Sequence, residues 1–215
     1  MKYSTILFDL DGTITDPKEG ITKSVQFALK RMGIEENDLE KLIPFIGAPL
    51  KAAFQEFYGL SENEAIKAIA FYREYFADKG IFENKVYEGI EDLLSELKSK
   101  NKRLILATSK VSSFALRIMR HFGLADYLDE IVGSNLDGTR SEKTEILRYI
   151  LDTYKVLKEG TVMVGDRKYD AVAAAANGIE SIAVGYGYGS DEELKNANFT
   201  LYEKDVSALK AELMK

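Results

Sequence analysis

The sequence predicts an α/β protein in which a doubly wound parallel sheet carries an all-helical insertion after its first strand. Three observations predict it: short and almost continuously apolar runs, amphipathic segments between those runs, and a long stretch with helical periodicity after the first run. Strands of a parallel sheet are covered by helices on both faces, so they are apolar on both sides. Strands that alternate with amphipathic helices are typical of a doubly wound sheet.

The strands and helices of the sheet domain can be assigned in chain order. Each expected strand is a short apolar run that ends in small or polar residues, and each expected helix has apolar residues three and four positions apart. We expect strands at 5–10, 103–107, 130–133, 161–165 and 181–185, and helices at 90–99, 114–122 and 143–154.

The insertion is assigned from helix-terminal signals. Asp16 and Pro17 form an N-cap followed by proline at the first helical position, and Ser61 and Glu64 match a capping box. Gly33 and Gly80 end the two long helices, and a shorter helix is expected at about 49–58. We therefore divide the chain into a sheet domain, 1–15 and 86–215, and a helical insertion, 16–85, that contains no expected strand.

Composition narrows the function. The chain has 215 residues, a net charge of −6 and no cysteine. An acidic chain without a dense basic run is a poor binder of nucleic acid or anionic membranes, and the lack of cysteine excludes disulfides and thiolate metal sites. The first residues do not resemble a signal peptide, and no apolar run is long enough to span a membrane. We expect a cytoplasmic protein with no nucleic-acid or membrane partner.

Polar side chains gather where the expected strands end. Open α/β sheets bind ligands at the carboxyl ends of their strands. The polar residues expected there are Asp9, Asp11, Thr108, Ser109, Lys143, Asp166 and Asp170. Several carboxylates together need a cation, and hard oxygen ligands suit Mg²⁺. An aspartate can also attack phosphorus, while hydroxyl and ammonium groups can hold phosphoryl oxygens.

These residues resemble the motifs of the haloacid dehalogenase-like phosphatases. The matching segments are Asp9-Leu10-Asp11-Gly12-Thr13, Thr108-Ser109, Lys143, and Gly165-Asp166 followed by Asp170, and they occur in the family's order. The resemblance implies the family's Rossmann-like core with a small helical cap, the cap being 16–85. Phe45–Leu50 and Gly185–Ser190 resemble loops of its phosphoglycolate phosphatase-like branch.

The resemblance also implies roles for the aspartates. Asp9 would be the nucleophile and a Mg²⁺ ligand, and Asp11 the general acid and base that lends its backbone carbonyl to the metal. Asp166 would be a further ligand. Asp170 would be a ligand or the partner of one, although an acidic residue in the first turn of a helix has a structural explanation as well.

The remaining motifs would hold the substrate. Thr108, Ser109 and Lys143 would bind the phosphoryl group of a small phosphorylated metabolite. Gly47 and Ala48 of the insertion loop would select among substrates, where alanine replaces a more usual proline. The pattern leaves open whether Lys110 and Arg167 are surface charges or phosphate contacts, and whether the protein is a monomer or a dimer.

Several activities compete with a phosphoglycolate phosphatase-like hydrolysis of a phosphomonoester. The alternative is a 5′-nucleotidase or a sugar-phosphate phosphatase of the same superfamily. A phosphosugar mutase is less favoured, because such enzymes typically carry a histidine in the cap and 16–85 contains none. A haloacid dehalogenase would not need Asp11. A non-catalytic binding protein on this fold would normally lack one of the motifs, and none is missing.

Overall fold

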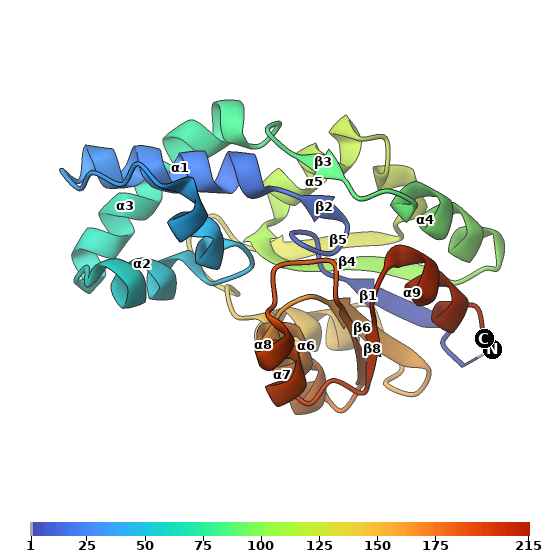
Figure 1. The fold of residues 1–215 in the computed structure, drawn as a ribbon. Coiled ribbons are helices and arrows are strands. Elements are labelled where there is room, and N and C mark those ends of the chain that lie inside the picture. Colours follow the sequence, from blue (N-terminus) through green and yellow to red (C-terminus); the bar gives the residue numbers. More distant parts are fainter. Residues whose placement is uncertain (1) are drawn as a thin grey trace. The chain divides into compact units, whose positions relative to one another are not determined.

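The computed structural model describes residues 2–215 and divides them into two compact units. One unit comprises the chain up to Thr15 together with Val86–Lys215, and we call it the α/β unit. The other, Asp16–Lys85, is the helical unit. Figure 1 shows the chain coloured from one end to the other. No helix in the described part of the chain combines the length and the apolar character needed to cross a bilayer.

The α/β unit is built on a parallel sheet with the strand order β5-β4-β1-β6-β7-β8. Each pair of neighbouring strands in this sheet runs parallel. The strands are β1 Thr5–Phe8, β4 Arg103–Val111, β5 Glu130–Ser134, β6 Thr161–Gly165, β7 Glu180–Val184 and β8 Leu201–Glu203. This architecture confirms the doubly wound fold that the sequence predicts.

The central strand β1 marks the point where the chain changes direction across the sheet. From β1 the chain adds β4 and β5 on one side, and then returns to add β6, β7 and β8 on the other. β1 and β6 are buried along their whole length, which explains their continuous apolar sequences. Ligands of such sheets bind at this switch point, beyond the carboxyl ends of the two strands.

Helices cover both faces of the sheet. α4 packs against α9, and α6 packs against α7, with the two pairs on opposite faces (Figure 1). Leu7, Ile105, Met163 and Ile146 belong to one buried apolar cluster beneath α6 and α7. The α-helices of this unit are α4 Ile90–Ser99, α5 Ser112–His121, α6 Lys143–Thr153, α7 Lys168–Asn177, α8 Asp191–Asn196 and α9 Val206–Leu213, and a 3-10 helix spans Ala125–Tyr127.

The helical unit packs α1 against α3. Its helices are α1 Lys18–Arg31, a 3-10 helix Leu39–Phe45, α2 Leu50–Tyr58, α3 Glu62–Tyr75 and a π-helical turn Phe76–Gly80. Ser61 caps α3 through a complete capping box with Glu64. α1 approaches the π-helical turn so closely that a Cβ on Gly20 would lie 1.9 Å from the carbonyl oxygen of Gly80. Glycine at both positions permits this contact.

The structure corrects several details of the expected elements. Pro17, expected as the first helical residue after an N-cap at Asp16, is itself the N-cap of α1. β4 continues to Val111 instead of ending at 107, and β8 was not expected. α3 ends at Tyr75, before the π-helical turn that reaches Gly80. The short strands β2 Thr15–Asp16 and β3 Lys85–Val86 form a two-stranded sheet at the boundary of the insertion, where no strand was expected. Strands of two or three residues are too short to show a burial pattern.

Candidate active site

Asp9 and Asp11 occupy a tight turn at the end of β1. The backbone N–H of Asp9 continues the ladder to β6 by donating to the carbonyl of Val164, at 2.9 Å. The chain then turns at Gly12, whose φ is +86°, a conformation that glycine adopts without strain. A Cβ at this position would lie 2.1 Å from Oδ2 of Asp166. The glycine therefore lets the turn lie directly against the next aspartate.

Asp166 and Asp170 are delivered by the end of β6 and the start of α7. Asp166 follows Gly165, the last residue of β6, and Asp170 lies in the first turn of α7. Oδ2 of Asp170 accepts a hydrogen bond from the backbone N–H of Arg167 at 3.2 Å. A Cβ on Gly165 would come within 2.1 Å of Cγ of Asp170, so glycine is required for this approach.

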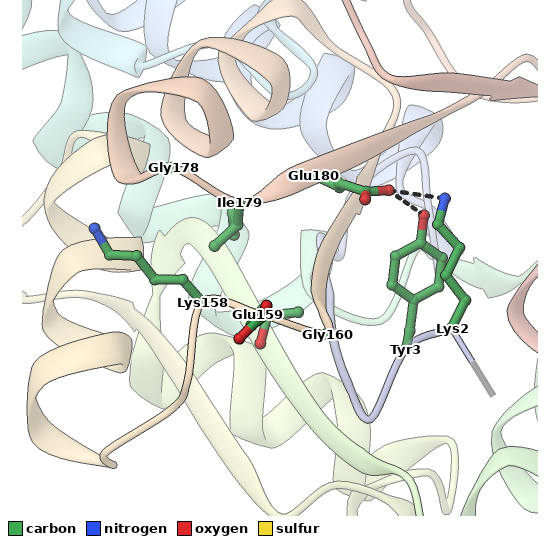
Figure 2. Close-up of a pocket in the computed structure, with 9 residues that line it drawn as sticks. Lys2, Tyr3, Lys158, Glu159, Gly160, Gly178, Ile179 and Glu180 are labelled. Carbon is green, nitrogen blue, oxygen red and sulfur yellow. Dashed lines mark hydrogen bonds and ion pairs between the residues drawn. The ribbon is translucent and has the colours of Figure 1, made fainter.

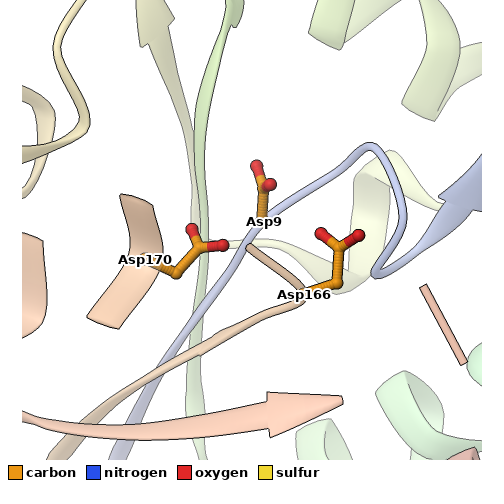
Figure 3. Close-up of side chains that lie close together, drawn as sticks. All are labelled: Asp9, Asp166 and Asp170. Carbon is orange, nitrogen blue, oxygen red and sulfur yellow. The ribbon is translucent and has the colours of Figure 1, made fainter. Parts of the chain in front are cut away.

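Three of the predicted carboxylates converge. Asp9, Asp166 and Asp170 are all buried, and each has a carboxylate oxygen within 4.8 Å of an oxygen of the other two. Figure 3 shows the three side chains, which come from the β1 end, the β6 end and α7. Asp11 lies on the turn that follows Asp9 and is buried as well. The structure thus brings the four predicted aspartates to one edge of the sheet.

Lys143 joins the cluster from the first residue of α6. Its Nζ lies 2.7 Å from Oδ1 of Asp9 and 2.9 Å from Oδ1 of Asp170. Its ammonium also donates to the carbonyl oxygen of Ala107 at 3.0 Å. Only 4% of the side chain is exposed. The buried ammonium group of Lys143 therefore connects Asp9 and Asp170 to the backbone of β4.

Lys110 and Arg167, whose roles the sequence leaves open, are not surface charges. Nζ of Lys110 lies 2.8 Å from Oδ2 of Asp11, and both side chains are almost fully buried. Arg167 donates from Nε to Glu193 at 2.9 Å, and the backbone N–H of Lys168 donates to the same carboxylate oxygen. Lys110 therefore belongs to the aspartate cluster, while Arg167 ties α7 to α8.

Thr108 and Ser109 lie within β4, beyond Leu106, the last residue that pairs with β1. The sequence placed them just after the strand. Oγ1 of Thr108 is an acceptor for the backbone N–H of Lys110, at 3.2 Å. The carbonyl of Ser109 accepts a hydrogen bond from the hydroxyl of Ser134 at 2.9 Å. The segment is therefore held in place by its own side chains and by β5.

Gly47 and Ala48 are found in the helical unit, and not in the α/β unit that carries the aspartates. They connect the 3-10 helix to α2. Gly47 has a φ of +77°, and the N–H of Ala48 donates to the carbonyl of Phe45 at 3.4 Å. The loop is a tight turn in which glycine is the favoured residue.

Burial and mutual repulsion make the aspartate cluster electrostatically unfavourable. Burial raises the pKa of Asp166 well above its usual value, and the charges of Asp9 and Asp170 raise it further. Burial also raises the pKa of Asp170, although Lys143 opposes the shift. Burial also raises the pKa of Asp11, and the ammonium group of Lys110 offsets part of that rise. Such shifts are concentrated at functional sites.

Lys143 is held in its charged form. Burial alone would lower its pKa, but the neighbouring carboxylates of Asp170 and Asp9 outweigh burial, and the pKa is raised. The ammonium is therefore a permanent positive charge at the edge of the sheet.

Comparison with known proteins identifies the family. The family model described as haloacid dehalogenase-like hydrolase matches residues 6–184. The chain belongs to the haloacid dehalogenase-like hydrolases. The crystal structure of a predicted phosphatase from Clostridium acetobutylicum matches with a TM-score of 0.97 and 47% identity, covering 100% of this chain and 99% of that one. The chain is a phosphatase of this family.

Relatives with named activities differ in what they act on. A 5′-nucleotidase from Pseudomonas aeruginosa is 48% identical over 98% of this chain and 95% of its own length. The tyrosine-protein kinase PtkA of Mycobacterium tuberculosis is 38% identical over 91% of this chain and 67% of its own. A phosphoglycolate phosphatase from Aliivibrio fischeri is 28% identical over 89% of this chain and 88% of its own.

The cluster fits the divalent cation that this family generally uses. Asp9, Asp11, Asp166 and Asp170 bring more negative charge than Lys110 and Lys143 compensate, and all six groups are buried. Among the described residues, Oδ1 of Asp166 is buried with no hydrogen-bond partner. Buried carboxylate oxygens without partners are costly unless a cation binds them. Hard oxygen donors of this kind suit Mg²⁺.

Sequence reasoning did not assign the contacts made by the glycine- and tyrosine-rich loop 185–190 of this hydrolase. The backbone N–H of Tyr188 donates to Oδ2 of Asp166 at 2.7 Å, and the hydroxyl of Tyr186 donates to the carbonyl of Thr13 at 2.9 Å. A Cβ on Gly187 would lie 2.3 Å from Cβ of Asp166. The alternation of glycine with tyrosine was the available signal, because only glycine allows the loop to approach so closely.

A separate hollow of about 400 Å³ lies at the opposite edge of the sheet. Its lining comes from the amino-terminal ends of β1, β6 and β7, including Tyr3, Gly160 and Glu180. Figure 2 shows that Lys2 and Tyr3 both reach Glu180, so the charges that line this part of the hollow neutralise one another. None of the predicted site residues lines it.

Proposed function

We propose that this protein is a Mg²⁺-dependent phosphatase that hydrolyses a small phosphomonoester through an aspartyl-phosphate on Asp9. The observation that carries the proposal is the surroundings of Asp9. Its carboxylate shares a buried cluster with Asp166 and Asp170, and one of its oxygens is paired with Lys143 at 2.7 Å. A nucleophile for phosphorus, a cation site and an ammonium group are therefore within reach of one phosphoryl group.

The first half-reaction would proceed at Asp9. A carboxylate oxygen of Asp9 attacks phosphorus, the bond from phosphorus to the leaving oxygen breaks, and Asp11 supplies a proton to that oxygen. Lys143, Thr108 and Ser109 would bind the non-bridging phosphoryl oxygens during the transfer. When bound by Asp9, the carbonyl of Asp11, Asp166 and Asp170, Mg²⁺ would neutralise charge on the phosphoryl group.

The second half-reaction regenerates the enzyme. Asp11, now ionised, accepts a proton from a water molecule, whose oxygen attacks the phosphorus of the aspartyl-phosphate. The bond between phosphorus and Asp9 breaks, and inorganic phosphate leaves. One residue can serve as acid and then as base because the first step leaves it in the form that the second step needs.

Nucleoside 5′-monophosphates are the first substrates to test. The relative with 48% identity is a 5′-nucleotidase, whereas the phosphoglycolate phosphatase is 28% identical. Identity along the full chain supports the nucleotide over the two-carbon acid that the loop resemblance suggested. The core residues would contact only the phosphoryl group, so we place substrate selection in the loop around Gly47 and Ala48.

Phosphate release tests the proposal directly. We expect Mg²⁺-dependent release from one class in a panel of nucleoside monophosphates, phosphoglycolate and sugar phosphates, and loss of release in EDTA. Asp9→Asn should fold normally and retain less than about 1% of the activity, because an amide cannot attack phosphorus. Release that is unaffected by EDTA, or comparable turnover in Asp9→Asn, would contradict the mechanism.

A further inference from the structure

A second buried lysine is paired with an aspartate of the site. Nζ of Lys110 lies 2.8 Å from Oδ2 of Asp11, and only 6% and 9% of the two side chains are exposed. Removing two charges from water is costly, and a buried ion pair is weak evidence for stability. Lys143 already supplies an ammonium to Asp9 and Asp170. The position of Lys110 on Asp11 therefore calls for a separate explanation.

The backbone around Lys110 is fixed from both sides. β4 pairs with β5 in one register up to Ala107 and in a shifted register at Val111, so Lys110 lies within the irregular segment. Its N–H donates to Oγ1 of Thr108 at 3.2 Å. On the β5 side, a Cβ on Gly133 would lie 2.2 Å from the carbonyl oxygen of Lys110. The lysine thus extends from a rigid support.

The two carboxylate oxygens of Asp11 have different surroundings. Oδ2 is held by Lys110. Oδ1 is buried and has no hydrogen-bond partner among the residues that the structure describes. A carboxyl group that transfers a proton acts efficiently only if the acting oxygen is held in position. Holding one oxygen fixes the rotation of the whole carboxyl group and leaves the other available.

We propose that Lys110 is the positioning residue of Asp11: it holds Oδ2, so that Oδ1 is the oxygen that exchanges a proton with the leaving group. The inference rests on the proposed function, because it assigns Lys110 to the acid and base step of the same reaction. Lys143 would act on the nucleophile and the phosphoryl group, and Lys110 on proton transfer. Replacing Lys143 and replacing Lys110 should therefore affect different steps of the reaction.

The leaving group of the substrate separates these roles. An alkyl phosphate needs a proton on its leaving oxygen, whereas p-nitrophenyl phosphate releases a phenolate that is stable without one. We expect Lys110→Met to lower kcat/KM for the best alkyl phosphate about tenfold more than for p-nitrophenyl phosphate, since general acid catalysis contributes roughly 10²- to 10⁴-fold. KM for either ester should change little. Lys110→Arg should show a smaller difference between the losses of kcat/KM for the two esters, because arginine retains the positive charge.

A matched variant controls for the loss of a buried lysine. Lys102, just before β4, is buried and donates to the carbonyl of Tyr3 at the far edge of the sheet. Lys102→Met should change the two kcat/KM values by the same factor or not at all. Thermal unfolding of each variant identifies misfolding, and if Lys110→Met does not fold, the leaving-group ratio of Lys110→Arg decides.

A double variant ties the effect to Asp11. In an Asp11→Ala background, adding Lys110→Met should cause no further loss that depends on the leaving group. Equal losses for both esters in Lys110→Met, or a change confined to KM, would overturn the inference and leave the proposed function intact. Failure of the wild-type protein to hydrolyse any phosphomonoester would overturn the proposed function, and this inference with it.

Discussion

Gly12 has no side chain, and this allows the turn after β1 to lie directly against Asp166. Its φ of +86° and its distance to Asp166 both exclude a Cβ, which would lie 2.1 Å from Oδ2 of Asp166. We expect Gly12→Ala to lower kcat/KM by at least about a hundredfold and to weaken Mg²⁺ activation, since displacement of about 1 Å can cost that much. Steady-state kinetics over a Mg²⁺ titration would measure both effects.

Gly123 provides the matched control for this prediction. Its φ is +70°, and a Cβ there would meet no atom within 4 Å. Gly123→Ala therefore carries the same backbone strain without the collision, and it should lower the thermal midpoint while leaving the kinetics unchanged. Equal losses of activity in the two variants would show that strain alone, and not the contact with Asp166, accounts for the effect.

The aspartates could be predicted from the sequence, whereas the role of Lys110 could not. Asp9 and Asp166 directly follow strands that are largely apolar in sequence, and parallel strands bring their carboxyl ends together. A lysine after a strand has the same local sequence whether it is solvated or buried. Its burial depends on Asp11, far away in the sequence, and on the irregular register of β4. Neither leaves a local pattern.

At the scale of elements, burial on a periodic face made most of the fold predictable. α4 was expected at 90–99 and spans Ile90–Ser99, with Ile90, Leu93, Leu94 and Leu97 buried. β8, by contrast, has three residues, and none of them is buried. It pairs with β7 through backbone hydrogen bonds, which the sequence does not encode in side-chain pattern. Amphipathic or buried elements can be predicted, whereas short edge strands cannot.

The loop between the 3-10 helix and α2 is the element to which we assign substrate selection. Gly47 has a positive φ, so a bulky residue there would strain the backbone, and the adjacent Ala48 is the better position to test. We expect Ala48→Arg to lower kcat/KM for the best substrate at least about tenfold more than for acetyl phosphate. A side chain that contacts the leaving group affects kcat/KM only if the leaving group is large, and the acetate released from acetyl phosphate is small.

The control places the same arginine on the exposed face of α2. Ala52 is exposed, and Ala52→Arg should leave both kcat/KM values unchanged. If Ala48→Arg reduces hydrolysis of both substrates by one factor, the loop does not select the substrate, and selection must be sought in another part of the chain.

At the scale of the whole molecule, the aspartate cluster links folding to pH. Burial raises the pKa of Asp11, Asp166 and Asp170 in the folded protein above the ordinary value of 3.8. Between that value and the raised one, the folded state binds more protons than the unfolded state. The contribution of these groups to stability is therefore fully present below about pH 4 and is lost as the pH rises through the folded pKa values. For Asp170 the folded value is about 6.

A divalent cation should reverse this loss. Mg²⁺ bound to the ionised carboxylates of the folded protein would raise the free energy of unfolding in proportion to the logarithm of its concentration above Kd, and protons would compete with it. We expect Mg²⁺ at about 10 mM to raise the thermal midpoint clearly at about pH 8 and much less at about pH 5, where Asp170, with a pKa of about 6, takes up a proton. Differential scanning fluorimetry at both pH values, with and without EDTA, measures the shift.

Asp166→Asn should abolish the Mg²⁺-dependent shift, while Asp78→Asn, at an exposed residue of the helical unit, should retain it. A shift of equal size at both pH values, or one that survives in Asp166→Asn, would mean that Mg²⁺ does not bind at the cluster.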